Sequence, residues 1–238
     1  MARKIKIDNA IQKRFNKEKN KQKKNTSREV KVYFLIVCEG LKTEPNYFKS
    51  FPIKIGNYVY DLSFDGGGIN TKKVVEKAIE LRDNSPQKYD RVWAVFDKDS
   101  FDKNHFNGAI QKAKANEIHC AWSNEAFELW YLLHFQYRNT SMSRKDYEKS
   151  IEKSINKLKE NGTVFEYKKN STEMYSILQK YGNQQQATNW AKNLIGQHTS
   201  NDLSSHNPCT TVHLLVEELN GQSEQLNSEI IKKIKKGK

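Results

Sequence analysis

The chain has 238 residues, a mean hydropathy of −0.88 and a formal net charge of +13. This length suffices for one sizeable core, and no apolar run approaches the roughly 20 residues that a membrane-spanning helix requires. The three cysteines are far apart and form no CxxC pair. That pattern argues against a zinc site or a disulfide framework and fits a cytoplasmic protein.

The positive charge is concentrated near the two ends of the sequence. Residues 1–31 contain twelve Lys or Arg against three acids, and residues 230–238 contain five Lys and no acid. Basic ends favour contact with nucleic acid phosphates, but they are also typical of solvated termini that aid solubility. We therefore expect a basic, flexible arm over 1–29, a basic tail over 223–238, and nucleic acid as a partner.

Between these ends, strand and helix patterns alternate. Apolar runs rich in β-branched and aromatic residues predict buried strands over 30–38, 58–64, 90–96 and 118–122. Apolar spacing and capping residues predict helices over 43–51, with Thr43 as the cap, and over 70–83, 102–116 and 126–135. The alternation predicts an α/β sandwich around a mostly parallel sheet, formed by residues 30–137.

Residues 138–222 differ from the preceding segment in their hydrophobic pattern. Their polar helical patterns, over 143–161, 171–181, 184–197 and 208–220, predict a helical C-terminal part that packs on the α/β core.

The last of these segments follows His206 and Asn207 and begins with Pro208. Together with Thr210 and Thr211, this run predicts a capped helix start. The N–H groups of such a start can bind an anion, which makes His206, Thr210 and Thr211 candidates for substrate binding, although simple capping explains the pattern as well.

Acidic residues end two of the predicted buried strands. Glu39 follows VYFLIVC, and Asp97 and Asp99 end the run DRVWAVFDKD. The carboxyl ends of parallel strands face the crevice in which α/β proteins bind ligands. Carboxylates gathered there repel one another unless a cation lies between them, and Mg²⁺ and Mn²⁺ prefer oxygen ligands. The sequence therefore predicts a Mg²⁺ or Mn²⁺ site formed by Glu39, Asp97 and Asp99, although each acid alone would be an ordinary surface turn residue.

Glu128 lies within the apolar run AFELWYLLHF, where a lone carboxylate is costly unless it is paired or binds a metal. Both alternatives stay open, and we include Glu128 among the catalytic candidates. Glu44 falls in the first turn of the helix predicted over 43–51, where the helix dipole favours an acid. It could equally join the acids or orient a substrate, as could the neighbouring Lys42. His134 is six residues after Glu128, off its helix face, and is expected to be a core histidine.

The pairing of Glu39-Gly40 with Asp97-Lys98-Asp99 resembles the Toprim domain. That fold is shared by topoisomerases, DnaG-type primases, OLD-family nucleases and small RNA-cleaving nucleases. More narrowly, four runs spread over about 32–220 resemble the RloB-like family: VCEGLKTEPNYF, FDKD, SNEAFELWYLLHF and NPCTTVHLLVEEL. Where the family pattern has a Pro-Cys-type pair, this chain has Glu125-Ala126, which adds a carboxylate near the expected site.

The resemblance implies a Toprim-like Rossmannoid fold and a role in bacterial defence against phage, because the family is linked to restriction–modification loci. It implies a Mg²⁺-dependent nuclease that cleaves RNA, tRNA included, or DNA, in which Glu39 shares the metal or acts as general acid or base. The alternative is a latent or non-catalytic subunit that binds nucleic acid and an ATPase encoded nearby, since the chain has no Walker motif. Homo-oligomerisation stays open.

Overall fold

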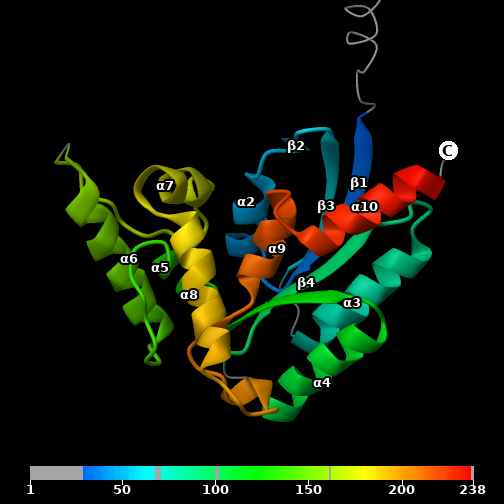
Figure 1. Cartoon of the computed structure of the whole chain (residues 1–238). Helices are drawn as coiled ribbons and strands as arrows, with labels where there is room; N and C mark the ends of the chain where they lie inside the picture. The colour runs from blue at the N-terminus through cyan, green and yellow to red at the C-terminus, as the bar shows by residue number, and fades with distance from the viewer. Residues whose placement is uncertain (1–28, 68–70, 100–101, 161, 237–238) are drawn as a thin grey trace, which may run out of the picture.

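The computed structural model describes residues 29–67, 71–99, 102–160 and 162–236. The arm expected over 1–29 therefore lies almost wholly outside the described residues. Six strands form one sheet in the order β2-β3-β1-β4-β5-β6 (Figure 1). The four inner strands run parallel to one another: β3 (Tyr58–Gly66), β1 (Val30–Cys38), β4 (Arg91–Asp97) and β5 (His119–Asn124). This confirms the predicted α/β fold with a mostly parallel sheet.

Two short strands, which the sequence pattern did not predict, complete the sheet at its edges. Strand β2 (Lys54–Ile55) pairs antiparallel with β3, and β6 (Cys209–Thr210) pairs antiparallel with β5. Each has only two residues, so neither produces an alternating pattern that can be told from a loop or from the start of a helix.

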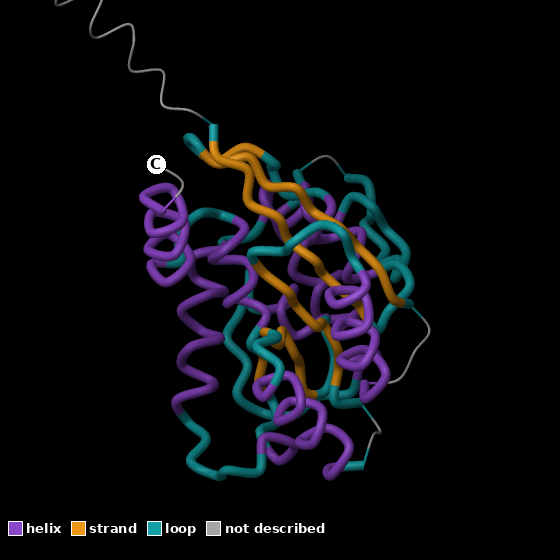
Figure 2. Tube along the Cα trace, turned by 90° about the vertical axis from the view of Figure 1, so that its right-hand side faces the viewer, coloured by secondary structure: helices purple, strands orange, loops and turns teal. Residues whose placement is uncertain are grey.

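Helices cover both faces of the sheet, as the tube in Figure 2 shows. Helices α3 (Thr71–Asn84) and α4 (Lys103–Ala115) pack on the face formed by Leu35, Val37 and Phe96. The remaining helices share the core of the opposite face: α2 (Thr43–Lys49), α5 (Glu128–Leu132), α6 (Arg144–Leu158), α7 (Met174–Tyr181), α8 (Gln184–Gly196), α9 (Val212–Leu219) and α10 (Glu224–Lys236). A short 3₁₀ turn, Leu203–Ser205, joins α8 to β6.

The helix predicted over 126–135 is shorter than expected. Only Glu128–Leu132 is α-helical, because the chain then tightens into three-residue turns, with His134 N–H donating to Tyr131 O and Phe135 N–H to Leu132 O. The segment is nevertheless almost fully buried, as its apolar composition predicted.

Two predicted helix caps are wrong because both threonine side chains bind distant parts of the chain. Thr43 Oγ1 donates to Lys169 O (2.7 Å), and Lys42 occupies the cap position of α2 without a side-chain hydrogen bond. Thr211 Oγ1 accepts from the backbone N–H of Trp122 (2.9 Å) in β5. Thr211 occupies the cap position of α9, but its side chain accepts no N–H of that helix. The predicted anion-binding helix start at 208 is therefore an edge strand, and the helix begins only at Val212.

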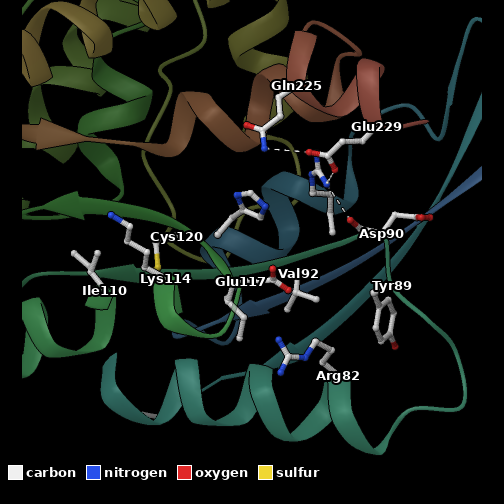
Figure 3. A pocket seen from close by; sticks show the side chains of 13 residues that line it. Arg82, Tyr89, Asp90, Val92, Ile110, Lys114, Glu117, Cys120, Gln225 and Glu229 are labelled. Atoms are coloured by element: carbon white, nitrogen blue, oxygen red, sulfur yellow. Dashed lines mark hydrogen bonds and ion pairs between the residues drawn. The ribbon is translucent and has the colours of Figure 1, made fainter. Parts of the chain in front are cut away.

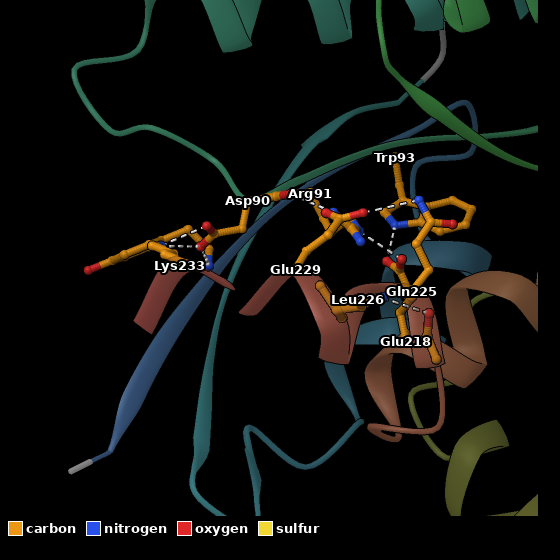
Figure 4. A network of polar contacts seen from close by, with 10 residues as sticks. Asp90, Arg91, Trp93, Glu218, Gln225, Leu226, Glu229 and Lys233 are labelled. Atoms are coloured by element: carbon orange, nitrogen blue, oxygen red, sulfur yellow. Dashed lines mark hydrogen bonds and ion pairs between the residues drawn. The ribbon is translucent and has the colours of Figure 1, made fainter. Parts of the chain in front are cut away.

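The segment expected as a basic tail is mostly helix α10, which docks on the sheet through buried Leu226 and Ile230. Arg91, at the start of β4, holds this helix and α9: its Nη1 donates to Glu229 Oε2 of α10 (2.6 Å) and its Nε to Glu218 Oε1 of α9 (2.8 Å) (Figure 4). The apolar positions of α10 repeat at helical spacing, so Lys232, Lys233 and Lys235 are exposed while its other side packs.

Candidate metal centre

A small pocket of about 170 Å³ lies at the carboxyl ends of β1 and β4. Five carboxylates line it, and they come from three strand ends or loops and two helices: Glu39, Glu44, Asp97, Asp99 and Glu128. The structure therefore places the four acids predicted as catalytic, together with Glu44, in one pocket at the edge where parallel strands end. Such an edge is where α/β proteins bind their ligands.

Backbone pairing between β1 and β4 brings Glu39 and Asp97 together. Glu39 N–H donates to Val95 O (2.8 Å), which extends the pairing one residue beyond β1. In return, Asp97 N–H donates to Glu39 Oε2 (3.1 Å). Asp99 follows two residues later with a positive φ of 40° and points its half-exposed carboxylate into the same pocket.

Glu44 reaches the pocket from the first turn of α2, and its position explains why glycine follows Glu39. A Cβ placed at Gly40 would collide with the carboxylate of Glu44. The Glu44 side chain is only 6% exposed, and its Oε2 has no hydrogen-bond partner among the described residues. An unsatisfied buried carboxylate oxygen is costly, so this atom is a candidate ligand.

Arg144, the first residue of α6, lies between the acids and was not predicted. Its Nη2 is 3.0 Å from Asp97 Oδ2 and 3.8 Å from Asp99 Oδ2, and its Nε is 3.7 Å from Glu128 Oε2. In the sequence it follows Ser143, a helix cap, where an arginine looks like a surface residue. No local pattern could have assigned it to strands that lie more than 40 residues earlier.

For Glu128 the structure shows a polar pairing, which is one of the two alternatives left open by the sequence. It is paired with Arg144, and its Oε1 also accepts a hydrogen bond from the Tyr167 hydroxyl (2.9 Å). The tyrosine comes from the loop between α6 and α7, which closes over the pocket from the side of the C-terminal helices. Lys169 of the same loop also lines the pocket.

Burial opposes full ionisation of these acids. It raises the pKa of Glu39 to about 7, with Glu44 and Asp99 adding repulsion, while the Asp97 N–H and Arg144 act in the opposite direction. Burial also raises the pKa of Glu44, and it raises the pKa of Asp97 well above its usual range, where Glu44 and Glu128 add to the effect. Five carboxylates face one guanidinium and Lys169, so added positive charge would lower these pKa values and favour the ionised acids.

The donor set fits a hard cation, but the side chains are not arranged around one. Among the described residues, no group of three or more His, Cys, Asp or Glu side chains is positioned to hold a metal ion as it stands. The guanidinium of Arg144 separates Asp97, Asp99 and Glu128. Oxygen donors and the unsatisfied Glu44 Oε2 suit Mg²⁺ or Mn²⁺ once this guanidinium moves aside.

Four further sequence candidates do not line the pocket. The Lys42 side chain is exposed beside it. His206 is buried, stacks on His198 and pairs with Ser200 O (2.8 Å). Thr210 and Thr211 are taken up by hydrogen bonds to β5, the first sharing one with Ser123 Oγ (2.9 Å). These contacts give all three buried side chains a structural role.

A larger pocket of about 610 Å³ lies at the opposite, amino ends of β4 and β5 (Figure 3). Its lining mixes both signs of charge, with Arg82, Lys114 and Arg91 against Asp90, Glu117 and Glu229. Arg91 and Glu229 are bonded to each other there. Of these two pockets, the smaller one has an excess of acids over basic side chains, which makes it the stronger candidate for cation-dependent chemistry.

A Rossmann-like α/β sheet with an acidic pocket at its carboxyl edge is the class of protein that this fold and site define. The model for RloB-like proteins matches residues 34–219, and the chain belongs to the RloB-like family. No curated protein and no solved structure gives a significant match. None of the described helices combines the length and the apolar character needed to span a membrane.

Proposed function

We propose that this protein is a Mg²⁺- or Mn²⁺-dependent nuclease that hydrolyses phosphodiester bonds in RNA, tRNA included, or in DNA, as an effector of bacterial defence against phage. The observation that supports this proposal is the set of five carboxylates in one pocket at the carboxyl ends of β1 and β4. Substrate class and biological role rest on membership of the RloB-like family and on its resemblance to Toprim nucleases.

Glu39, Asp97 and Asp99 are the residues that would hold the cation. When bound, it would supply Lewis-acid stabilisation of the charge that develops on the phosphoryl group. Glu39 also lies where it can move a proton to or from a reacting oxygen. Arg144, once released from Asp97, is the nearest guanidinium that can bind a phosphate oxygen, a role for which its planar donors are well suited.

A second function, a latent subunit, is favoured by the contacts of Arg144. Its guanidinium occupies the space between three of the acids and so opposes cation entry in the resting chain. In this alternative a partner, such as an ATPase encoded nearby, shifts α6 and completes the site. ATP dependence would then reside in the partner, because the sequence has no Walker motif.

The test is a cleavage assay with the purified full chain on total tRNA, single-stranded DNA and plasmid, with Mg²⁺, with Mn²⁺ and with EDTA. We expect metal-dependent cutting of one polymer, reduced at least about a hundredfold by Asp97→Asn and by Glu39→Gln. Asp83→Asn is the matched control, because Asp83 is an exposed acid paired with Arg82 on α3.

Full activity of Asp97→Asn would overturn the assignment of the site. If the wild-type chain cuts none of the polymers although it binds Mn²⁺, the nuclease proposal fails for the isolated chain. The latent-subunit alternative then takes its place, and the assay is repeated with the partner added.

A further inference from the structure

Helix α6 carries a row of lysines that starts beside the acid pocket. Lys145, Lys149, Lys153 and Lys157 recur every four residues, a spacing that aligns side chains along one side of a helix, and all four are exposed. At 1.5 Å per residue the row extends over about 18 Å. Its near end adjoins Arg144, which contacts Asp97.

These lysines are not neutralised within the described part of the chain. No ion pair joins any of the four to a carboxylate of the described residues, and the ion pairs of α6 are those of Arg144. The acid Glu152 on the same helix is directed elsewhere, because its Oε1 accepts the N–H of Tyr167 (2.8 Å). The row is therefore an exposed stripe of positive charge that forms no ion pair with a described carboxylate, although Asp146 and Glu148 lie on the same helix.

The far end of the row borders a pocket of about 640 Å³ between α6, the turn after α5 and the turn between α7 and α8. Lys153 and Lys157 line it together with the rings of Phe135 and Tyr181. Pockets of this size accommodate small planar ligands. Charge on one wall and aromatic rings on another match the two chemical parts of a nucleotide.

His134 lines this pocket and has an unsatisfied hydrogen-bond acceptor. The side chain is 2% exposed, and its Nδ1 faces Trp130 O at 2.9 Å, so Nδ1 carries the proton. Nε2 is left with a lone pair and has no partner among the described residues. Burial lowers the pKa of His134 to about 4, which keeps the ring neutral. The acceptor therefore matches an N–H or O–H donor, such as those on the edge of a nucleobase.

We propose that α6 is the binding track for a single strand of nucleic acid, with phosphates on the lysine row and one unstacked base in the pocket beside His134. This proposal rests on the proposed nuclease function and specifies how the substrate leads away from the acid pocket. A single strand is required, because a base can enter a protein pocket only when it is free of its stack.

Binding is measured by the fluorescence anisotropy of labelled single-stranded RNA and DNA oligonucleotides in EDTA, over a range of salt concentrations. The row variant combines Lys149→Gln, Lys153→Gln and Lys157→Gln. The affinity falls with salt, and for single strands each phosphate contact contributes about 0.7 to the steepness of log affinity against log salt. Loss of three contacts should therefore make this dependence about 2 units less steep. The RNA and DNA arms show which polymer the track prefers.

The control variant removes the same charge elsewhere on the surface, through Lys54→Gln, Lys88→Gln and Lys114→Gln, all at exposed positions. We expect it to keep the wild-type slope. An equal fall of the slope in both variants would mean that binding follows net charge alone, and it would overturn the track.

The base pocket is tested with Tyr181→Ala, against Tyr89→Ala in the pocket at the other end of the sheet as control. Loss of one stacked base weakens binding about tenfold, so only Tyr181→Ala should show this loss. On an oligonucleotide of abasic nucleotides, Tyr181→Ala and the wild type should bind equally. Wild-type affinity of Tyr181→Ala for the normal strand would overturn the base pocket.

Failure here and failure of the nuclease are distinguishable, because binding is measured without metal. If cleavage depends on Asp97 but the row variant binds nucleic acid like the wild type, the track proposal fails and the nuclease proposal stands. If binding depends on the lysine row but the chain cuts no polymer, the track stands and the nuclease proposal fails.

Discussion

Arg144 determines the resting charge of the acid pocket. It is the only guanidinium among the described residues that line this pocket, and it faces Asp97, Asp99 and Glu128 at once. A cation that enters must compete with it for the same oxygens, so protein stability and metal affinity are coupled through this one side chain.

Replacing Arg144 should therefore have opposite effects on the two properties. We expect Arg144→Gln to lower the free energy of unfolding in EDTA by about 2 kcal/mol, because buried carboxylates lose their counter-ion. We expect it to bind Mn²⁺ several-fold more tightly, since the competing charge is gone. Thermal unfolding with and without Mn²⁺, and Mn²⁺ titration by electron paramagnetic resonance, measure both effects.

Arg138→Gln is the control for this variant, because Arg138 is near in sequence, donates to Thr140 O and does not line the acid pocket. It should change neither property by more than about 0.5 kcal/mol. Weaker Mn²⁺ binding by Arg144→Gln would show that the arginine supports the metal site and does not compete with it.

Gly40 can be tested in the same way. A methyl group at this position collides with the Glu44 carboxylate, so we expect Gly40→Ala to destabilise the protein by about 1–3 kcal/mol and to weaken Mn²⁺ binding. Gly108→Ala on α4 is the matched control, because its added Cβ meets nothing within 4 Å. In a helix that change should stabilise by up to about 1 kcal/mol. Urea unfolding compares the two, and equal effects would contradict the proposed role of Gly40.

Among the helices and strands, the sequence best predicts the strands that are buried on both faces of the sheet. Strand β4 is buried at all seven positions, and its continuous apolar run is visible without any partner. The edge strand β6 is defined by pairing with the distant strand β5, which no local pattern contains. Helix α5 is shortened by three-residue turns, which an apolar run does not distinguish from α-helix. The four predicted acids follow from the same logic, because they lie at strand ends or in an apolar helix.

Arg144 and Glu44 mark the limit of that logic at the site. Arg144 enters the pocket only because α6 folds back against the strand ends. The sequence left the role of Glu44 open, since a first-turn acid is common in helices. Tertiary contacts assign both residues to the pocket, and spacing along the chain does not.

The docking of α9 and α10 depends on one buried acid. Glu218 is 4% exposed and accepts from both Arg91 Nε and Trp93 Nε1, each at 2.8 Å (Figure 4). We expect Glu218→Gln to cost about 2–3 kcal/mol in the free energy of unfolding, because the buried Arg91 loses one of its two charge partners and keeps Glu229. Chemical denaturation measures this loss.

The neighbouring Glu217 provides the control for this element. It pairs with Lys192, whose side chain is half-exposed, and Glu217→Gln should cost less than about 1 kcal/mol. If the two variants were equally stable, the Arg91 network would contribute nothing specific to the docking of the C-terminal helices.

For the whole molecule, the dependence of stability on pH combines two opposing sets of buried groups. Burial raises the pKa of Glu39 to about 7, so the folded state takes up this proton first and gains stability as pH falls. Burial lowers the pKa of His134 and His213 to about 4, so here the unfolded state binds protons first and folding loses stability as pH falls.

The histidine contribution can be isolated with His213→Leu. His213 lies on α9 near Glu217 and Lys192, and its pKa of about 4 compares with 6.5 in an unfolded chain. The contribution of neutral His213 to the stability of the folded state is therefore complete above pH 6.5 and is lost as the pH falls towards 4. Relative to the variant, the wild type should lose about 2 kcal/mol between pH 7 and pH 5, because only the wild type has an imidazole at position 213, which takes up its proton in the unfolded state at higher pH than when it is buried. Urea unfolding of both proteins at the two pH values measures this difference, and the acid pocket cancels because it is common to both. A difference that does not change with pH would mean that the imidazole reaches water in the folded state.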